Sequence, residues 1–267
     1  MSILSMGAGG AEEYTVDQSL RFDDTAGTKL TRTPSSAGNL KTWTLSFWMK
    51  ELNLETSTSQ FVIFDGGGAS SSETPFGIVD QCIEFNYWNS GTSSQAFKIK
   101  TNQVFRDPSA WYHIVCVYDS PQVTAADRLK LYVNGSQVTS FSTANYPAQD
   151  LDATVNDAYE HYIGTGKQGQ DWSGYLAEFY LIDGTALDAS SFGKTEAATG
   201  QWIPKDASTL TFGTNGFYLP FSSSQLSTDI RNLDEATGHS ARAFGNANTS
   251  TAQKQFGTAS AFFDGTG

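Results

Sequence analysis

Three histidines and a few strand carboxylates are the side chains of this sequence that could supply acid–base chemistry. His113 lies in an apolar stretch between Trp111 and Val115, where we expect packing or hydrogen bonding rather than catalysis or metal ligation. His161 begins another strand-like stretch, and His239 lies in a segment typical of a linker. The sequence contains neither a metal spacing such as His-X-X-X-His or Cys-X-X-Cys nor the Gly-X-Ser-X-Gly of many hydrolases. These residues predict no catalytic centre.

The glutamates do not form the pair that glycoside hydrolysis requires. Such a pair needs two carboxyl groups roughly 5 to 9 Å apart. Glu84 and Glu178 lie in separate strands, while Glu51 and Glu55 lie at a strand end and its loop. We expect Glu178 to face solvent or to pair with a Lys or Arg side chain. The sequence therefore predicts a protein that is not an enzyme, and a polysaccharide depolymerase remains the alternative.

The charge balance limits the partners of the chain. Its 267 residues carry a formal net charge of −12, which disfavours nucleic acid and anionic membranes because both would repel it. No segment approaches the roughly 18 apolar residues of a membrane span, so no membrane insertion is expected. The N-terminus lacks the pattern of a signal peptide, which predicts assembly in a cytoplasm without secretory export. Cys82 and Cys116 lie in strand-like runs, where we expect buried free thiols.

Alternation of apolar and polar residues predicts strands along most of the chain. Residues 43–49 place four apolar side chains on one face, and residues 111–118 are apolar on both faces, which is typical of a central strand. Residues 129–138 form the clearest hairpin, with Asn134 and Gly135 as its type I′ turn. Further strands are expected at residues 19–22, 61–64, 83–88, 96–100, 161–163, 175–182 and 217–221.

Helical patterns are scarce. One short turn is expected at residues 187–192, where Asp188 could cap it. Many strands with almost no helix predict an all-β sandwich or barrel.

The chain divides into three parts by composition. Residues 1–16 are small and lack a core pattern, so they predict an N-terminal arm or tether. Residues 17–221 hold the predicted strands, and residues 222–267 begin with a linker rich in Ser, Thr, Asn and Ala. The end of the chain at 260–267 resembles the opening segment at 19–27, which indicates the start of a second, truncated module. A closing strand that resembles the opening one by chance is the alternative.

Several segments together resemble the laminin-G-like, concanavalin-type jelly-roll domain. They are the Phe-Asp pair at 22–23, residues 43–48, 111–119, 129–135, 163–166 and 172–179, and the resemblance covers residues 18–221. It implies an antiparallel two-sheet jelly-roll sandwich, here with an extended N-terminal arm. Domains of this kind often bind calcium, and the candidate ligands here are Asp65, Asp119 and Asp152, with Asp80, Asp150 and Asp157 nearby. Solvated turn aspartates are the alternative, and calcium is allowed rather than required.

A narrower resemblance concerns virion proteins of tailed bacteriophages. Residues 180–193 and 199–205 and the opening residues 1–10 are similar to proteins of tail fibres, tail spikes and other appendages. The resemblance implies a virion location, other virion proteins as partners and a homo-oligomer, for which we expect a trimer. The expected virion-anchoring residues are Ile3, Leu4, Met6, Gly7, Gly9 and Gly10.

Exposed aromatic side chains would suit glycan binding, because sugars stack on aromatic faces. Trp88, Tyr146, Tyr159 and Trp172 lie in or near predicted loops, and they could instead pack against another subunit. We therefore expect a structural virion appendage protein that binds host-surface polysaccharide or neighbouring subunits. A secreted lectin or adhesin is the alternative outside enzymes.

Overall fold

A computed structural model describes residues 14–25, 27–52, 54 and 56–221, together with the strands at 242–244, 248–250 and 260–262. The regular secondary structure of the described residues is almost entirely strand, and their two helices are 3-10 turns of three residues each. Neither of these described helices could cross a membrane. The two turns are η1 (Ala125–Asp127) and η2 (Ala189–Ser191).

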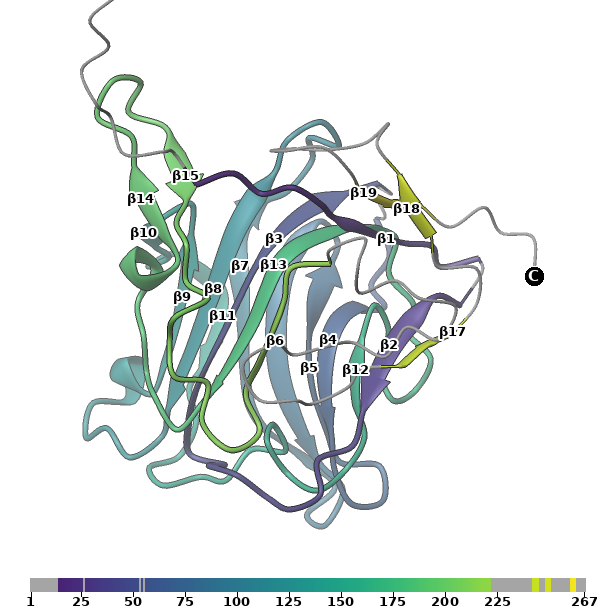
Figure 1. Cartoon of the computed structure of the whole chain (residues 1–267). Helices are drawn as coiled ribbons and strands as arrows, with labels where there is room; N and C mark the ends of the chain where they lie inside the picture. Colours follow the sequence, from purple (N-terminus) through teal and green to yellow (C-terminus); the bar gives the residue numbers. More distant parts are fainter. Residues whose placement is uncertain are drawn as a thin grey trace, which may run out of the picture.

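Two large antiparallel sheets face each other and form a sandwich, as expected (Figure 1). The seven-stranded sheet has the order β1 (Leu20–Phe22), β13 (Gly174–Asp183), β3 (Thr42–Glu51), β8 (Tyr112–Asp119), β9 (Leu129–Val133) and β10 (Ser136–Gln137), and β16 (Phe217–Leu219) also pairs with β13. The eight-stranded sheet has the order β11 (Phe141–Asn145), β7 (Ser94–Val104), β6 (Cys82–Asn89), β5 (Glu73–Val79), β4 (Phe61–Gly67), β12 (His161–Ile163), β2 (Lys29–Arg32) and β17 (Arg242–Phe244). Small hairpins join β14 (Gly193–Thr195) to β15 (Trp202–Pro204) and β18 (Asn248–Ser250) to β19 (Ser260–Phe262).

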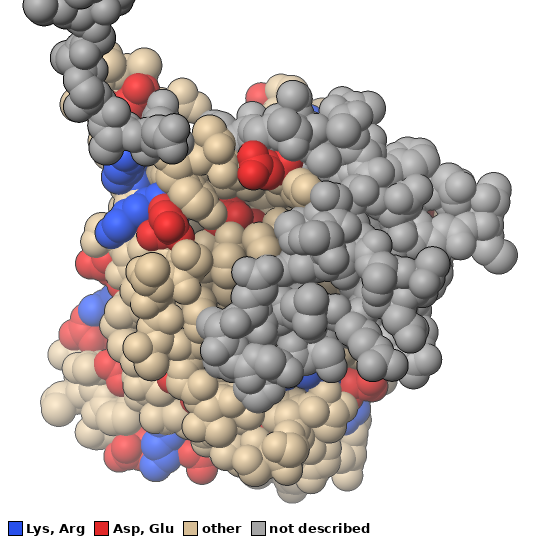
Figure 2. Space-filling model, in the orientation of Figure 1, with Lys and Arg blue, Asp and Glu red and all other residues tan. Residues whose placement is uncertain are grey.

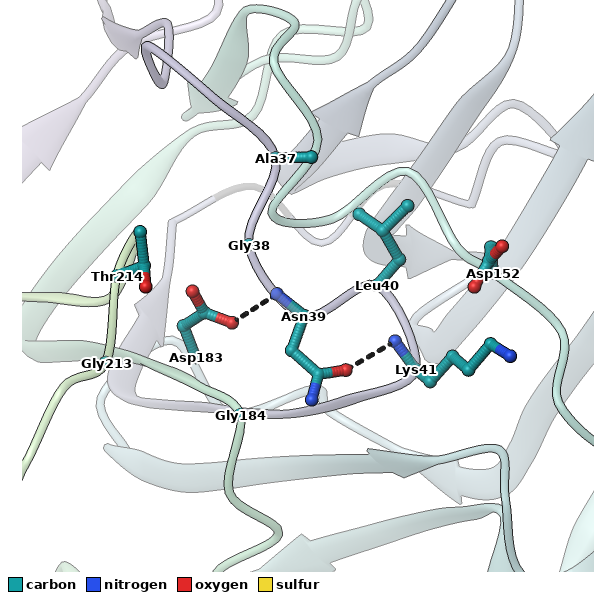
Figure 3. A pocket seen from close by; sticks show the side chains of 10 residues that line it. All are labelled: Ala37, Gly38, Asn39, Leu40, Lys41, Asp152, Asp183, Gly184, Gly213 and Thr214. Carbon is teal, nitrogen blue, oxygen red and sulfur yellow. Dashed lines mark hydrogen bonds between the residues drawn. The ribbon is translucent and has the colours of Figure 1, made fainter.

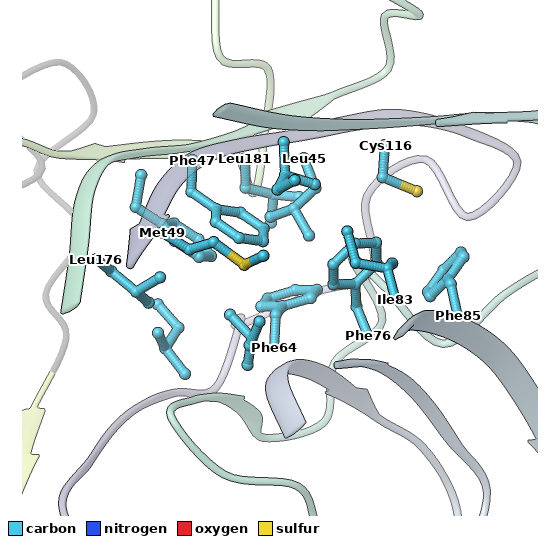
Figure 4. Packing of buried hydrophobic residues seen from close by; sticks show 14 of the residues in the cluster. Leu45, Phe47, Met49, Phe64, Phe76, Ile83, Phe85, Cys116, Leu176 and Leu181 are labelled. Carbon is cyan, nitrogen blue, oxygen red and sulfur yellow. The ribbon is translucent and has the colours of Figure 1, made fainter. Parts of the chain in front are cut away.

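Alternating side chains of both sheets fill the core between them (Figure 4). The predicted inward face of β3 is confirmed, because Trp43, Leu45, Phe47 and Met49 are all buried in this core. The ring of Phe47 meets the ring of Phe76 in the opposite sheet at a centroid distance of 5.7 Å. The sheets are therefore held together by direct apolar contact, which is the main stabilising term in such a fold.

The predicted turns are confirmed where local chemistry specifies them. Asn134 and Gly135 adopt φ values of 47° and 80°, as a type I′ turn requires. The Asp188 side chain accepts a hydrogen bond from the backbone N–H of Ser190 and so caps η2. Cys82 and Cys116 are buried free thiols, as expected.

Of the predicted arm, residues 1–16, the structure describes only residues 14–16, and the arm itself stays a prediction. Tyr14 and Val16 pack on Trp48, Ala177 and Trp202, which lie on the outer side of the seven-stranded sheet. The six predicted anchoring residues, Ile3, Leu4, Met6, Gly7, Gly9 and Gly10, lie outside the described residues, as does His239. Of the predicted linker and second module, three short strands are described, and one of them, β17, pairs with β2 of the sandwich. The truncated module stays a prediction.

Candidate functional site

One end of the sandwich carries a set of loops that hydrogen bonds join into a continuous surface. We call this surface, made of residues 37–41, 68–72, 89–93, 150–160, 183–184 and 213–214, the loop end. The segment 150–160 crosses it, because the backbone N–H of Ala153 donates to the carbonyl of Leu40 and that of Gly38 donates to the carbonyl of Asn156. The hydroxyls of Ser72 and Ser90 share a hydrogen bond of 2.8 Å, which ties two further loops together.

A polar depression of about 580 Å³ opens at the loop end between residues 37–41, Asp152, Asp183 and Thr214 (Figure 3). Asp183 organises its wall, since its carboxylate accepts hydrogen bonds from the backbone N–H of Asn39 at 2.8 Å and of Asn215 at 2.9 Å. The side-chain amide of Asn156 donates to the same carboxylate at 3.1 Å. A Cβ at Gly38 would lie 2.1 Å from an Asp183 oxygen, so only glycine allows this approach. The Asp183 carboxylate therefore fixes the positions of the loops that contain Asn39, Asn156 and Asn215.

The three predicted calcium ligands do not come together. Asp65 lies in β4 and is 0% exposed, Asp119 ends β8 in the other sheet, and Asp152 is exposed at the depression. Within the described ranges, no three His, Cys, Asp or Glu side chains are placed to share a metal ion. The Asp65 carboxylate instead accepts the backbone N–H groups of Thr74 at 2.9 Å and Lys167 at 2.8 Å. Burial raises its pKa to about 7.

The four predicted glycan-stacking residues differ in their exposure. Trp88 and Tyr159 are exposed, at 38% and 42%, and both belong to the loop end or its margin. Tyr146 is partly buried against the core. Trp172 is 1% exposed and packs on Phe22 at a centroid distance of 6.1 Å, so the expectation of an accessible ring at Trp172 is corrected.

The outer face of the eight-stranded sheet adds residues that the sequence analysis did not single out. Trp88 lies directly opposite Glu73 in β5 and opposite Gln95 in β7, and Glu73 lies opposite Gly67 in β4. The outward direction of Trp88 could be predicted from the alternation along β6. Ile83, Phe85 and Tyr87 enter the core, so the next residue must point away from it. The neighbours of Trp88 depend on strand register, which the sequence does not state.

Glu178 does not face solvent or pair with Lys or Arg, contrary to expectation. It is 4% exposed, and its carboxylate accepts hydrogen bonds from the hydroxyls of Tyr14 at 2.8 Å, Tyr180 at 2.6 Å and Tyr218 at 2.8 Å. Its φ of +50° coincides with a register shift in the pairing of β13 with β3, which is the geometry of a bulge. Burial raises the pKa of Glu178, and the three hydroxyls oppose that rise. The carboxylate thus holds the N-terminal segment.

We expect Tyr14→Phe to lower the free energy of unfolding by about 1–2 kcal/mol, because a hydrogen bond to a buried carboxylate is lost. The same deletion of a hydroxyl at exposed Tyr159 is the control and should change stability by less than about 0.5 kcal/mol. Urea unfolding of both variants measures this, and equal small effects would contradict the role of Glu178.

Two histidines are buried and neutral, as the structural expectation for His113 requires. The indole N–H of Trp202 donates to His113 Nδ1 at 3.0 Å, and His113 Nε2 lies 3.0 Å from Ser46 Oγ. The backbone N–H of Asn156 donates to His161 Nε2 at 2.9 Å. Burial lowers the pKa of His113 to about 3 and that of His161 to about 4. Neither imidazole is placed to act as a general base on a ligand.

Charge on the visible face is dispersed. Figure 2 shows Lys and Arg side chains standing beside Asp and Glu along the margins, and much of the described surface between them is uncharged. The described part of this face carries no continuous basic patch of the kind that binds nucleic acid.

Comparison with known proteins identifies the family. Residues 23–191, more than half of the chain, match the family model Laminin_G_3, described as the concanavalin A-like lectin/glucanases superfamily. The chain belongs to this superfamily, whose lectin-like jelly-roll fold the two sheets form. No curated protein matches the chain.

Solved structures show weak likenesses. The chain is similar to a native heptameric SAP-like pentraxin from Limulus polyphemus, with 16% identity and a TM-score of 0.46 over 73% of this chain and 94% of that one. It is similar to domains LG4-5 of the mouse laminin alpha1 chain, with 12% identity and a TM-score of 0.44 over 66% of this chain and 44% of that one. A third likeness is to the CBM40 of a Ruminococcus gnavus IT-sialidase bound to sialyllactose, with 13% identity and a TM-score of 0.38 over 55% and 87%.

Proposed function

We propose that the protein is a non-enzymatic structural component of a virion, in a tail fibre or other appendage, that binds host-surface glycan through its jelly-roll domain. The observation that carries the binding role is the exposure of Trp88 and Tyr159 at one end of a lectin-like fold. Membership of a superfamily named for lectins and glucanases supports a carbohydrate ligand. The similarity of residues 180–193 and 199–205 to phage appendage proteins supports the virion location.

The positions of three carboxylates support binding over cleavage. Asp65 and Glu178 are both inaccessible, and Asp183 accepts three N–H donors that hold the loops. A glycosidase needs two carboxyl groups that reach the same bond. We therefore propose a binding role without cofactor requirement, so a chelator should leave glycan binding unchanged, and calcium remains an optional ligand.

The tether to other virion proteins is proposed to lie before Tyr14. Removal of residues 1–16 would also remove Tyr14 and Val16, which pack on the sandwich, so that deletion would confound folding with anchoring. Deletion of residues 1–13 keeps both contacts.

Deleting residues 1–13 should leave the unfolding midpoint unchanged and abolish incorporation into particles. Immunoblotting of purified particles, with the full chain as control, measures incorporation. Normal incorporation of the shortened chain would contradict the tether, and absence of the full chain from particles would contradict the virion role. Sedimentation of the full chain tests the expected trimer.

A further inference from the structure

A row of residues crosses four strands on the outer face of the eight-stranded sheet. The register places Gln95 of β7 opposite Trp88 of β6, Trp88 opposite Glu73 of β5, and Glu73 opposite Gly67 of β4. Neighbouring strands lie about 4.8 Å apart, so the part of the row that a ligand could reach, from Gln95 to Glu73, is about 10 Å long. This length suits a short oligosaccharide chain lying across the strands better than a single sugar.

The backbone beside Trp88 departs from regular pairing. Tyr87 lies opposite Phe97 but Trp88 lies opposite Gln95, so β7 has one extra residue at this point. Such a bulge changes the direction of the neighbouring side chains and is common beside binding sites. Here it brings exposed Gln95, rather than Ala96, beside the exposed indole of Trp88. An amide donor and acceptor thus accompanies an aromatic face.

Glu73, in the middle of the row, has an unused hydrogen-bonding capacity. It is half-buried, and its Oε2 atom is buried without a hydrogen-bond partner among the described residues. A buried acceptor without a donor is costly and uncommon, so it marks a place where a ligand or water would donate. Sugar hydroxyls are such donors.

Gly67 and Tyr162 close the row at its other end. A Cβ at Gly67 would lie 2.4 Å from the carbonyl oxygen of Glu160 and 3.3 Å from the ring of Tyr162. Tyr162 of β12 points to the same face as Asp65, with which it pairs, and its hydroxyl donates to Glu160 at 2.8 Å. The row therefore has an aromatic ring near each end, with a carboxylate between them.

The charges around the row disfavour an anionic ligand. Glu73 and Glu160 lie at the row with Asp65 beneath it. Lys167 is a nearby cation whose ammonium donates to the carbonyl of Gly68, and Lys98 on the same face is paired with Glu84. The whole chain carries −12, so a sialylated or uronic acid polymer would be repelled. A neutral glycan meets no such barrier.

We propose that Gln95, Trp88 and Glu73 form the glycan-binding row of this protein, closed at one end by Tyr162 and buried Gly67, and that its ligand is a neutral oligosaccharide. One sugar ring stacks on Trp88, and hydroxyls of that ring and its neighbours bond to Gln95 and to Glu73. The inference rests on the proposed glycan-binding function and assigns to it a place and a ligand class.

Binding of the full chain to immobilised neutral oligosaccharides (glucan, mannan and galactan) and to acidic ones (polysialic acid and polygalacturonate) tests the row. Trp88→Ala should weaken neutral-glycan binding about tenfold, which corresponds to the loss of one stacking contact. Gln95→Ala should weaken it about threefold, as one hydrogen bond is lost. Val123→Ala is the control, because Val123 is an exposed apolar residue that lies outside the row and outside the loop end, and it should bind like the wild type.

The possible results distinguish an error in the proposed row from an error in the proposed glycan-binding function. Neutral-glycan binding that survives in both row variants, or binding confined to acidic glycans, would overturn the row while leaving a glycan-binding protein. Failure of the full chain to bind any oligosaccharide of the panel would overturn the proposed function as well. Gln95 is exposed, so its variant reports on the row even where Trp88→Ala folds poorly.

Discussion

Acidification from pH 7 to pH 4.5 should remove about 2–3 kcal/mol of stability at each of two buried imidazoles, His113 and His161. Their pKa values are lowered to about 3 and about 4, below the ordinary value of 6.5. The unfolded chain therefore takes up protons as the pH falls below 6.5 while the folded chain does not. The stabilisation is complete above pH 6.5 and decreases as the pH falls toward the two folded-state values.

Hydrogen bonding explains why these rings stay neutral. In each ring, one nitrogen accepts a hydrogen bond from a group that can only donate. This group is the indole N–H of Trp202 for His113 and the backbone N–H of Asn156 for His161. A second ring proton would point at that donor. Protonation thus disrupts the contact between β15 and the sandwich in one case and the segment 150–160 of the loop end in the other.

Urea unfolding of the wild type, His113→Gln and His161→Gln at pH 7 and pH 4.5 measures the effect. The wild type alone is not informative, because burial raises the pKa of Asp65 and Glu178 and their protonation favours the folded state on acidification. The stability advantage of the wild type over each variant should shrink at pH 4.5. An advantage that is equal at both pH values would contradict the neutral buried imidazoles.

Replacing Asp183 with alanine should lower the free energy of unfolding by about 3–5 kcal/mol. Three N–H donors lose their acceptor, and two of them belong to the buried residues Asn156 and Asn215. The wall of the depression at residues 37–41 should then lose its fixed position, which hydrogen exchange would detect as faster exchange of the Asn39 amide.

Asp152→Ala is the matched control for this experiment. Asp152 lines the same depression but is exposed, so its removal should change stability by less than about 0.5 kcal/mol. Similar losses in the two variants would show that the general acidity of the depression, rather than the bonds of Asp183, stabilises the loop end.

The fold could be predicted from the sequence where the signal is local. The alternation at Trp43, Leu45, Phe47 and Met49 depends on the two-residue period of a strand, and the turn at residues 134–135 depends on backbone preferences of its two residues. The laminin-G-like resemblance likewise rests on short segments in order along the chain, and the family match over residues 23–191 confirms it.

The candidate site could be predicted only in part, because exposure and strand register arise from contacts between distant segments. Trp172 follows a predicted loop, but its ring packs on Phe22, which is far away in the sequence, and is buried there. Glu178 is buried by a bulge and by tyrosines from three segments, and nothing in its strand pattern indicates either. Asp65 is covered because residue 167 folds back over β4.

Incubating the full chain with polysaccharide from the host surface, and measuring both bound sugar and new reducing ends, decides between an adhesive surface and a reaction centre. The proposed function predicts saturable binding with no rise in reducing ends over the buffer control. Continuous release of reducing ends would reveal a depolymerase, and the absence of binding to any host polysaccharide would contradict a glycan-binding role.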